Sequence, residues 1–314
     1  MISEEISAYP TFFLVGAPRC GTTAMSKYLS KHPNVCFSKP KEPHFFTLLH
    51  DLLDNPDIER DYLQRFFFHK TPEHTAVGEG SVSYLYSEDA IKSILNLNPQ
   101  AKFIVSVRNP VDMIYSYHAR MLKFLEEDQQ DFRVAWQLQE VRSQGLQLPK
   151  DCQYPHMLQY KEVGSVGNYV QKLINLVGRD RVHVVVFDDF VSDTLQAYKN
   201  VLAFLDLEYD GRTDFPRKGE NEAIKYKFLQ RILKRPPKRL ANFMLTLQQH
   251  KKRRKQVKKS WIERYRKRLV KKNQVRKERP PLDPETRRML AETFTDDVNI
   301  LQTLLNRDFS HWLQ

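Results

Sequence analysis

The sequence predicts an α/β fold in which a central, mostly parallel sheet is flanked by helices in three layers. Three short apolar runs, at residues 11–16, 102–107 and 182–187, are typical of buried strands. Each run is followed by a segment with helical periodicity, and strands that alternate with helices are typical of parallel sheets covered on both faces. We predict a single domain over residues 1–314.

Each predicted strand passes into a predicted helix. The first helix is expected at 23–29, with Thr22 or Thr23 as its N-terminal cap. The second helix begins at Pro110, because proline suits the first turn of a helix. The third helix includes 195–205 and follows two acidic residues.

The positive charge of the chain is concentrated in one segment. The 314 residues carry a net charge of +12, but residues 225–280 hold 23 lysines and arginines against two acidic residues. The remainder carries 27 basic and 36 acidic residues, so the net charge does not indicate a nucleic-acid-binding protein as a whole. We predict a basic helical insertion at about 225–280 and a C-terminal helix at 284–313 that returns to the core.

The basic segment allows three interpretations. Its apolar residues recur at every fourth position, which predicts an amphipathic cationic helix. Such a helix can be a solvated lid over a cleft, a membrane-surface helix, or a guide for an anionic polymer such as a sulfated glycan. No specific nucleic-acid binding is expected, because no recognised reading fold accompanies the segment. The recurring residues are Val257, Trp261, Tyr265 and Leu269.

The sequence contains no signal for export or membrane insertion. No apolar run approaches the roughly 18 to 20 residues that span a bilayer. Residues 1–5 lack the basic start and the apolar stretch of a signal peptide. Cys20, Cys36 and Cys152 are an odd number at spacings that suit neither a disulfide framework nor a zinc site. We expect a cytoplasmic protein, with peripheral contact at the inner membrane face through 225–280 left open.

Residues 16–23, Gly-Ala-Pro-Arg-Cys-Gly-Thr-Thr, join the first strand to the first helix. Small residues let backbone N–H groups point inward and the helix start adds partial positive charge, which predicts a phosphate site. The hydroxyls of Thr22 and Thr23 and the guanidinium of Arg19 supply further donors. The loop nearly matches that of nucleoside triphosphatases, so the fold is P-loop-like, but Thr22 stands where those enzymes have lysine.

A second candidate phosphate site follows the strand at 102–107. This strand ends in Arg108, and Ser116 follows about two helical turns later, an arrangement that suits a separate phosphate monoester. A triphosphatase would instead need an acid that organises magnesium. Asp188 and Asp189, after the third strand, have that character. A magnesium-dependent P-loop kinase therefore stays open, as does a non-enzymatic, membrane-associated nucleotide-binding protein.

The two phosphate motifs, in this order and at this separation, resemble those of the sulfotransferases that use 3′-phosphoadenosine-5′-phosphosulfate (PAPS). Residues 41–46 are similar to a signature of the heparan sulfate type and of many bacterial members. The resemblance covers about 11–220 and 281–313 and implies a bacterial source. Its motifs are Pro18-Arg19-Cys20-Gly21-Thr22-Thr23, Lys41-Glu42-Pro43-His44-Phe45-Phe46, Glu79-Gly80-Ser81-Val82-Ser83-Tyr84, Arg108-Asn109-Pro110 with Ser116, and Asp308-Phe309-Ser310-His311-Trp312.

The resemblance implies an enzyme of the EC 2.8.2 type. It would move the sulfuryl group of PAPS to a hydroxyl or amine of an acceptor, by in-line displacement, and release 3′,5′-bisphosphoadenosine (PAP). No metal is implied. The acceptor class stays open between a glycan, a lipid and a small metabolite, some of them anionic, and the oligomeric state is not indicated.

The resemblance also implies site residues. The loop would hold the 5′-phosphosulfate through Arg19, Cys20, Gly21, Thr22 and Thr23. The 3′-phosphate would be held by Arg108, Ser116 and a later loop of Arg217, Lys218 and Gly219.

The implied catalytic residues are Glu79, Lys41 and Arg19. Glu79 would be the base, although Gly80 stands where many members have lysine. Lys41 would stabilise the transferring sulfuryl oxygens. Arg19 would stabilise charge on the departing phosphate without donating a proton, because a guanidinium stays protonated. His44 and His118 are rival candidates for the base.

Overall fold

A computed structural model describes residues 9–48, 56–216, 222–226, 229, 268–270, 272–276 and 279–314. The expected loop at Arg217, Lys218 and Gly219 lies outside these residues, as does most of the basic segment. The chain divides into two compact units. The first comprises Met1–Tyr117, Gln159–Lys218 and Leu282–Gln314, and the second comprises His118–Leu158 and Gly219–Pro281.

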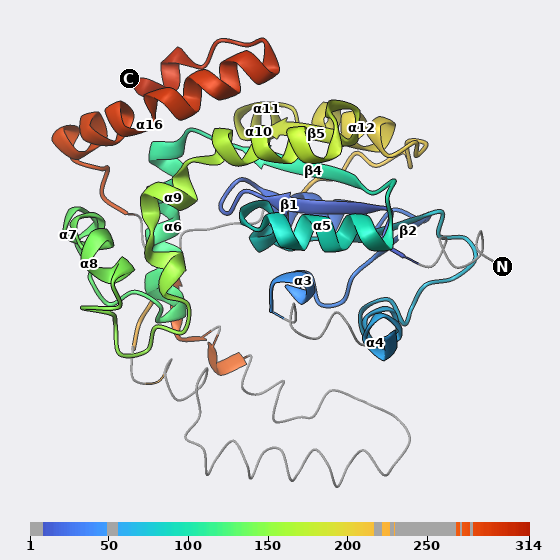
Figure 1. Ribbon diagram of the computed structural model, residues 1–314, viewed down its shortest axis with the longest axis horizontal. Coiled ribbons are helices and arrows are strands. Elements are labelled where there is room, and N and C mark those ends of the chain that lie inside the picture. The colour runs from blue at the N-terminus through green and yellow to red at the C-terminus, as the bar shows by residue number, and fades with distance from the viewer. Residues whose placement is uncertain are drawn as a thin grey trace, which may run out of the picture. The chain divides into compact units, whose positions relative to one another are not determined.

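The first unit is built on a five-stranded parallel sheet with the order β2-β3-β1-β4-β5. Helices lie on both sides of it, which confirms the predicted fold class (Figure 1). A parallel sheet needs this cover because both of its faces are apolar. The strands are β1 (Phe12–Gly16), β2 (Val35–Phe37), β3 (Ala76–Glu79), β4 (Lys102–Val107) and β5 (Val182–Val186).

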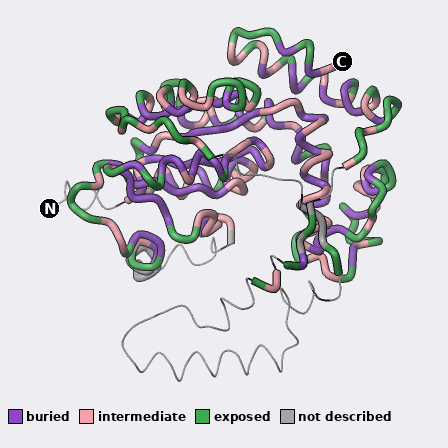
Figure 2. Tube along the Cα trace, turned by 180° about the vertical axis from the view of Figure 1, so that it is seen from behind, coloured by how far each residue is buried: buried purple, intermediate pink, exposed green. Residues whose placement is uncertain are grey.

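The two faces of the sheet have separate cores. On one face, Phe12, Leu14 and Ile104 pack with buried residues of α2 (Thr22–Leu29) and α12 (Thr194–Phe204). Alternate residues point to the other face, where Phe13 contacts the rings of Phe46, Tyr84 and Phe103. The strands are accordingly buried almost throughout (Figure 2).

The remaining helices of the first unit lie between and after these strands. α10 packs against the C-terminal α16. The elements are α3 (Phe45–Leu48), α4 (Pro56–Phe66), η2 (Val82–Tyr86), α5 (Glu88–Leu97), α6 (Pro110–Phe124), α9 (Tyr160–Gly164), α10 (Val166–Val177), η4 (Arg179–Arg181), α11 (Phe187–Ser192), α16 (Pro284–Leu305) and η5 (Ser310–Leu313).

Most predicted elements agree with the structure, and three details differ. The C-terminal helix predicted at 284–313 ends at Leu305, and the separate short helix η5 follows at Ser310–Leu313. β5 ends at Val186, because Phe187 already begins α11. The predicted cap of α2 is wrong: Gly21 occupies the N-cap position, and no side chain caps the helix. Thr22 lies inside the helix and is buried, so its hydroxyl is not at the capping position.

In the second unit, a two-stranded antiparallel ribbon pairs β6 (Glu222–Ile224) with β7 (Gln274–Arg276). These strands lie at the two ends of the segment that was predicted as a helical insertion, and sequence periodicity did not reveal them. The predicted stripe residues Val257, Trp261 and Tyr265 lie outside the described residues. Among the described residues of this unit, the helices include the end of α6 from His118 to Phe124, α7 (Phe132–Gln137), α8 (Gln139–Ser143) and η3 (Pro155–Leu158).

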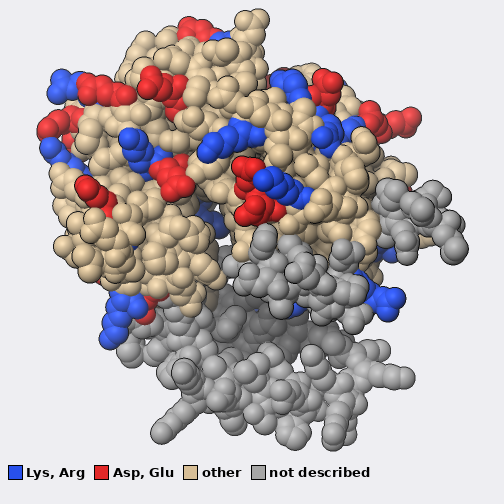
Figure 3. Space-filling view, in the orientation of Figure 1, with Lys and Arg blue, Asp and Glu red and all other residues tan. Residues whose placement is uncertain are grey.

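On the face shown in Figure 3, the surface charge of the described residues is mixed. In the space-filling view, lysine and arginine side chains lie among aspartates and glutamates, with no continuous patch of one sign on the face shown (Figure 3). Among the described residues, no helix is both long enough and apolar enough to cross a membrane.

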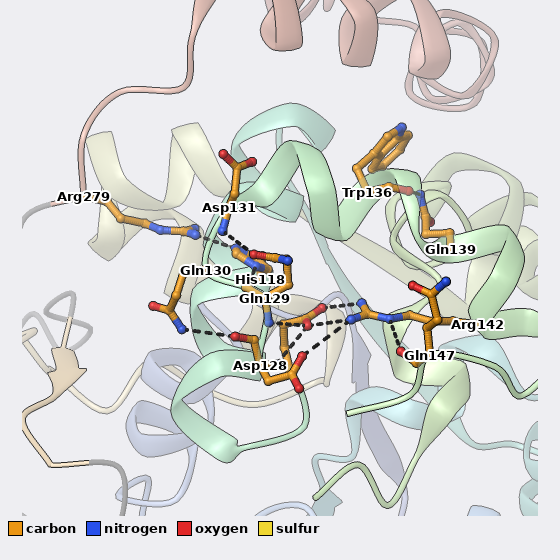
Figure 4. A network of polar contacts seen from close by, with 11 residues as sticks. His118, Asp128, Gln129, Gln130, Asp131, Trp136, Gln139, Arg142, Gln147 and Arg279 are labelled. Carbon is orange, nitrogen blue, oxygen red and sulfur yellow. Dashed lines mark hydrogen bonds and ion pairs between the residues drawn. The ribbon is translucent and has the colours of Figure 1, made fainter. Parts of the chain in front are cut away.

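A buried ion pair organises the second unit. Arg142 donates to both carboxylate oxygens of Glu127, at 2.6 and 2.9 Å, and its Nε donates to the carbonyl of Gln147 (Figure 4). Glu127 also accepts from the backbone amides of Asp128 and Gln129. A buried pair of this kind is tolerated because its polar atoms find partners.

Asp297 of α16 caps the start of α10, and replacing it should destabilise the first unit. Its carboxylate accepts from the amides of Gly167 and Asn168 and from the side chain of Asn168, at 2.8 to 2.9 Å. Asp297→Ala leaves buried donors unsatisfied, so we expect a loss of about 2 to 4 kcal/mol in the free energy of unfolding. Urea denaturation measures this, with the exposed neighbour Asp296→Ala as the control. Equal stabilities of the two variants would contradict the capping role.

Candidate functional site

The residues predicted to act on a phosphorylated ligand follow the strands of the sheet at one edge. Arg19 follows β1, Lys41 follows β2, Glu79 ends β3 and Arg108 follows β4. The carboxyl ends of parallel strands meet at the same edge of a sheet, and ligands of open α/β sheets bind there. The fold therefore gathers these four side chains from distant parts of the chain.

The loop after β1 has the backbone shape of an anion cradle. The amide of Ala17 donates to the carbonyl of Ser106 on β4, which ties the loop to the neighbouring strand at 2.7 Å. Arg19 and Gly21 then adopt positive φ angles of 66° and 83°, and α2 begins at Thr22. The first N–H groups of a helix have no intrahelical partner, so this turn presents donors and partial positive charge to an anion.

The structure brings the two predicted phosphate motifs together. The Nε of Arg19 donates to the hydroxyl of Ser116 on α6 at 2.9 Å. Arg108 reaches the backbone carbonyl of Arg19 at 3.4 Å, and its guanidinium lies 4.6 Å above the ring of Phe187. Cationic side chains held close together in this way are stabilised by bound anionic groups.

The thiol of Cys20 takes no part in acid–base chemistry. It is fully buried and contacts the carbonyl of Pro18 at 3.4 Å. Burial raises the pKa of Cys20 to about 12, although Arg108 and Arg19 pull it downward. Cys20 can therefore bind an anion only through its backbone N–H group.

Gly21 is required by two separate features of the loop. Its φ of +83° is costly for other residues, and an added Cβ would lie 2.9 Å from the ring of Phe190. We expect Gly21→Ala to lower the free energy of unfolding by about 2 kcal/mol or more, measured by urea denaturation. Gly211→Ala is the control, because Gly211 has a φ of +74° and nothing within 4 Å, so only the backbone cost of about 1 to 2 kcal/mol applies. A smaller loss at Gly21 than at Gly211 would contradict the predicted close packing.

The carboxylate of Glu79 is completely buried at the end of β3. The hydroxyls of Tyr62 and Ser81 both donate to it, the latter at 2.6 Å. Burial raises the pKa of Glu79 to about 7, while the hydrogen bonds from Ser81 and Tyr62 oppose the shift. A group with this pKa changes its charge near neutral pH.

The raised pKa of Glu79 predicts a pH-dependent stability. Above its ordinary pKa of 4.5 the unfolded chain releases a proton that the folded protein keeps until about pH 7. The stabilisation from this group is therefore full below 4.5 and is lost as the pH rises through about 7. The unfolding free energy of Glu79→Gln minus that of wild type should rise by about 1 to 3 kcal/mol from about pH 5 to about pH 8, because only the wild type loses the stabilisation from Glu79. Urea denaturation at both pH values checks this, and an unchanged difference would show an ordinary pKa.

A strained turn of the 41–46 motif lies beside Glu79. Lys41 pairs with Glu42 at 2.5 Å, and Glu42 and His44 have positive φ angles of 64° and 52°. The amide of His44 donates to the hydroxyl of Ser81, which itself donates to Glu79. Such strain persists only where surrounding contacts hold it and is common at functional sites.

Lys41 lies beside Gly80, the residue that follows Glu79. Its Cε is 3.4 Å from the position that a Cβ would take on Gly80, and its positive charge lowers the pKa of Glu79. The same Cβ would lie 3.1 Å from the ring of Phe37, so Phe37 is the tighter neighbour of Gly80.

The two histidines predicted as rival bases differ in their surroundings. His44 is partly exposed, and its Nδ1 lies 2.7 Å from the hydroxyl of Ser83. His118, in the second unit, is completely buried between the carbonyl of Gln129 and the guanidinium of Arg279 (Figure 4). Burial and then Arg279 lower the pKa of His118 to about 4. A histidine enclosed in this way cannot reach an acceptor proton without rearrangement of its neighbours.

The acidic pair after β5 is engaged by the C-terminal part of the chain. Asp188 accepts from the indole of Trp312 at 2.8 Å, and Asp189 forms an ion pair with Arg307. Among the described residues, no group of three or more histidines, cysteines, aspartates or glutamates is placed to hold a metal ion.

The family model for the sulfotransferase domain matches residues 9–299. The chain belongs to the sulfotransferase family. This confirms the resemblance seen in the motifs, and membership implies PAPS as the sulfuryl donor and PAP as the product. The kinase and the non-enzymatic alternative are not favoured.

Individual sulfotransferases are similar to parts or all of the chain. Carbohydrate sulfotransferase 15 of Mus musculus is 25% identical over 252 residues, which are 65% of this chain and 45% of that protein. Heparan sulfate glucosamine 3-O-sulfotransferase 6 of Mus musculus is 31% identical over 114 residues, 36% of this chain and 31% of that protein. The chain thus spans less than half the length of these curated relatives.

A solved sulfotransferase shares the fold over nearly the whole chain. The crystal structure of the sulfotransferase from Alicyclobacillus acidocaldarius has a TM-score of 0.66 and 24% identity, and covers 98% of this chain and 99% of that one. The same parallel sheet with helices on both sides is therefore the fold of this sulfotransferase.

Several residues of this sulfotransferase site were not assigned from the sequence. Tyr62 and Phe187 contact charged groups of the site, and no motif includes them. Ser81 was within the motif at 79–84, but no role was assigned to it. Glu42 was within a recognised motif, where its charge and the adjacent Lys41 were a usable signal.

Proposed function

We propose that this sulfotransferase moves the sulfuryl group of PAPS to a hydroxyl or amine of an acceptor by in-line displacement. The observation that carries the proposal is the hydrogen bond of Arg19 to Ser116, with Arg108 next to Arg19. This contact joins the loop after β1 to the motif of Arg108 and Ser116. A donor that carries phosphate groups on both the 5′ and the 3′ positions of its ribose needs both motifs. The guanidinium and hydroxyl groups at the start of α2 and on α6 fit such a donor chemically.

In this proposal each end of the donor has its own set of residues. Arg19 and the residues from Cys20 to Thr23 hold the 5′-phosphosulfate, while Arg108 and Ser116 hold the 3′-phosphate. The charge of Arg19 stabilises the negative charge that grows on the departing phosphate. Arg217, Lys218 and Gly219 stay a prediction for the 3′-phosphate, because they lie outside the described residues.

For the base, the site offers two carboxylates that differ in access. Glu79 has both oxygens bonded inside the protein and no exposed surface. The side chain of Glu42 is 21% exposed, and it lies beside Lys41 and His44. A base must come within hydrogen-bond reach of the acceptor proton, so we propose Glu42 for this role and keep Glu79 as the alternative. Lys41 is proposed to stabilise the sulfuryl oxygens.

The acceptor is proposed to be a hydroxyl or amine of a glycan, lipid or small metabolite. The names of the curated relatives point to carbohydrate and heparan sulfate acceptors, which supports testing glycans first. The basic segment at 225–280 stays a candidate for guiding an anionic acceptor or for contacting an anionic membrane.

A donor and acceptor assay tests this proposal. Purified protein should bind PAP in the presence of EDTA, and ATP with magnesium should not compete at similar concentration. With PAPS and a panel of glycan, lipid and small-molecule acceptors, mass spectrometry should show one product heavier by a sulfuryl group. Absence of PAP binding would overturn the proposal.

A further inference from the structure

The end of the chain forms a compact turn after α16. Asn306 ends the helix in the left-handed conformation, with a φ of 47°. Phe309 and Trp312 then stack with ring centroids 4.3 Å apart and are 0% and 1% exposed. The amide of Phe309 donates to the side chain of Gln302 on α16 at 2.8 Å, which anchors the turn to the helix. This turn at 306–312 contains the sequence motif at 308–312, to which the proposed function gives no role.

Trp312 contacts two segments that follow neighbouring strands. Its indole N–H donates to Asp188, the second residue after β5, at 2.8 Å. Its backbone carbonyl accepts from the side chain of Asn109, the second residue after β4, at 3.0 Å. The same Asn109 side chain accepts from the amide of Val111 at 2.9 Å, which caps the first turn of α6.

Both contacted residues adjoin a part of the donor site. Asn109 directly follows Arg108, and Asp188 directly follows Phe187, whose ring supports the Arg108 guanidinium at 4.6 Å. The helix that Asn109 caps carries Ser116. A second link, the ion pair between Arg307 and Asp189, holds the turn against the same end of β5.

We propose that Trp312 is a positioning residue for the donor. The ends of β4 and β5 are already paired in the sheet at Val107 and Val186, and the two hydrogen bonds of Trp312 link the segments that follow them, at Asn109 and Asp188. They thereby hold Arg108 over Phe187 in the orientation that receives the 3′-phosphate. Asp188, which resembles a metal ligand in the sequence, accepts the hydrogen bond of the Trp312 indole. The inference rests on the proposed function, because the proposed function assigns Arg108 to the 3′-phosphate of the donor.

The experiment compares variants of the indole–carboxylate bond in the full chain. Trp312→Phe keeps the stack on Phe309 and removes the N–H, and Asp188→Ala removes the acceptor at an exposed position. Each should weaken PAP binding about 10-fold, measured by calorimetry. The double variant should bind PAP about as tightly as the single variant with the lower affinity, because both substitutions remove the same hydrogen bond. Asp188→Asn, which keeps a carbonyl acceptor, should bind like wild type, as should the exposed neighbour His311→Ala.

A kinetic comparison separates positioning from simple stability. With PAPS varied at saturating acceptor, Asp188→Ala should raise the KM for PAPS about 10-fold and leave kcat unchanged, and at saturating PAPS the KM of the acceptor should also be unchanged. The inference is overturned if Asp188→Ala binds PAP as tightly as wild type, or if kcat and thermal stability fall together with affinity. If Trp312→Phe does not fold, Asp188→Ala alone decides. If wild type itself does not bind PAP, the proposed function fails and not the positioning role.

Discussion

Replacing Glu42 with glutamine is expected to lower kcat by about 100- to 10,000-fold while PAP affinity stays at the wild-type value. Glutamine has the size of glutamate but cannot accept the acceptor proton. The side chain is partly exposed and is held by Lys41 in a turn with two positive φ angles. Initial rates with saturating PAPS, and calorimetry with PAP, measure the two quantities separately.

Glu79→Gln is the matched variant, since it makes the same chemical change in a fully buried side chain. We expect a smaller loss of kcat, because glutamine can still bond to Ser81 and Tyr62 and so keep the 41–46 turn in place. A large loss in Glu79→Gln together with a near-normal rate in Glu42→Gln would give the role of base to Glu79. The pH at which activity rises would then follow the pKa of Glu79, about 7.

Arg108→Ala is expected to weaken PAP binding by about 30- to 1,000-fold, equivalent to about 2 to 4 kcal/mol. The change removes the cation that the Phe187 ring supports beside the loop after β1. Because only donor contacts are lost, the affinity for the acceptor should change little. Calorimetric titration with PAP in EDTA gives the value directly.

Lys102→Ala is the control for this effect. Lys102 begins the strand that Arg108 follows, and its ammonium also lies over an aromatic ring, that of Phe204 at 5.4 Å. It stands at the opposite edge of the sheet, so its loss should leave PAP affinity within about 2-fold of wild type. If the two variants bind PAP equally well, Arg108 does not hold the donor.

Three of the five strands of the sheet were predictable because their signal is local, whereas β2 and β3 were not predicted. The apolar run at 102–107 forms β4 without a shift in its bounds, Arg108 directly follows it, and Ser116 lies on α6. The capping of α2 was not predictable in the same way. A threonine before a helix normally caps it, but here Gly21 occupies the cap position in the left-handed conformation, two residues after Arg19, which also has a positive φ angle.

The division of labour between the two carboxylates required tertiary information. Nothing in the local sequence of Glu79, at the end of β3, shows that Tyr62 from α4 donates a hydrogen bond to it. Likewise, the acidic pair Asp188 and Asp189 looks like a metal site until the C-terminal turn, over 100 residues later, is seen to bond to it. Burial distinguishes the two carboxylates, and long-range hydrogen bonds engage the acidic pair. Neither feature leaves a pattern in a short window of sequence.

A crystal structure of the protein grown with PAP, without added magnesium, tests the central claim most directly. We expect the 5′-phosphate at the loop beside Arg19 and the start of α2, and the 3′-phosphate between Arg108 and Ser116. PAP bound elsewhere on the molecule, or with its phosphates away from both arginines, would contradict the assignment of this edge of the sheet as the donor site.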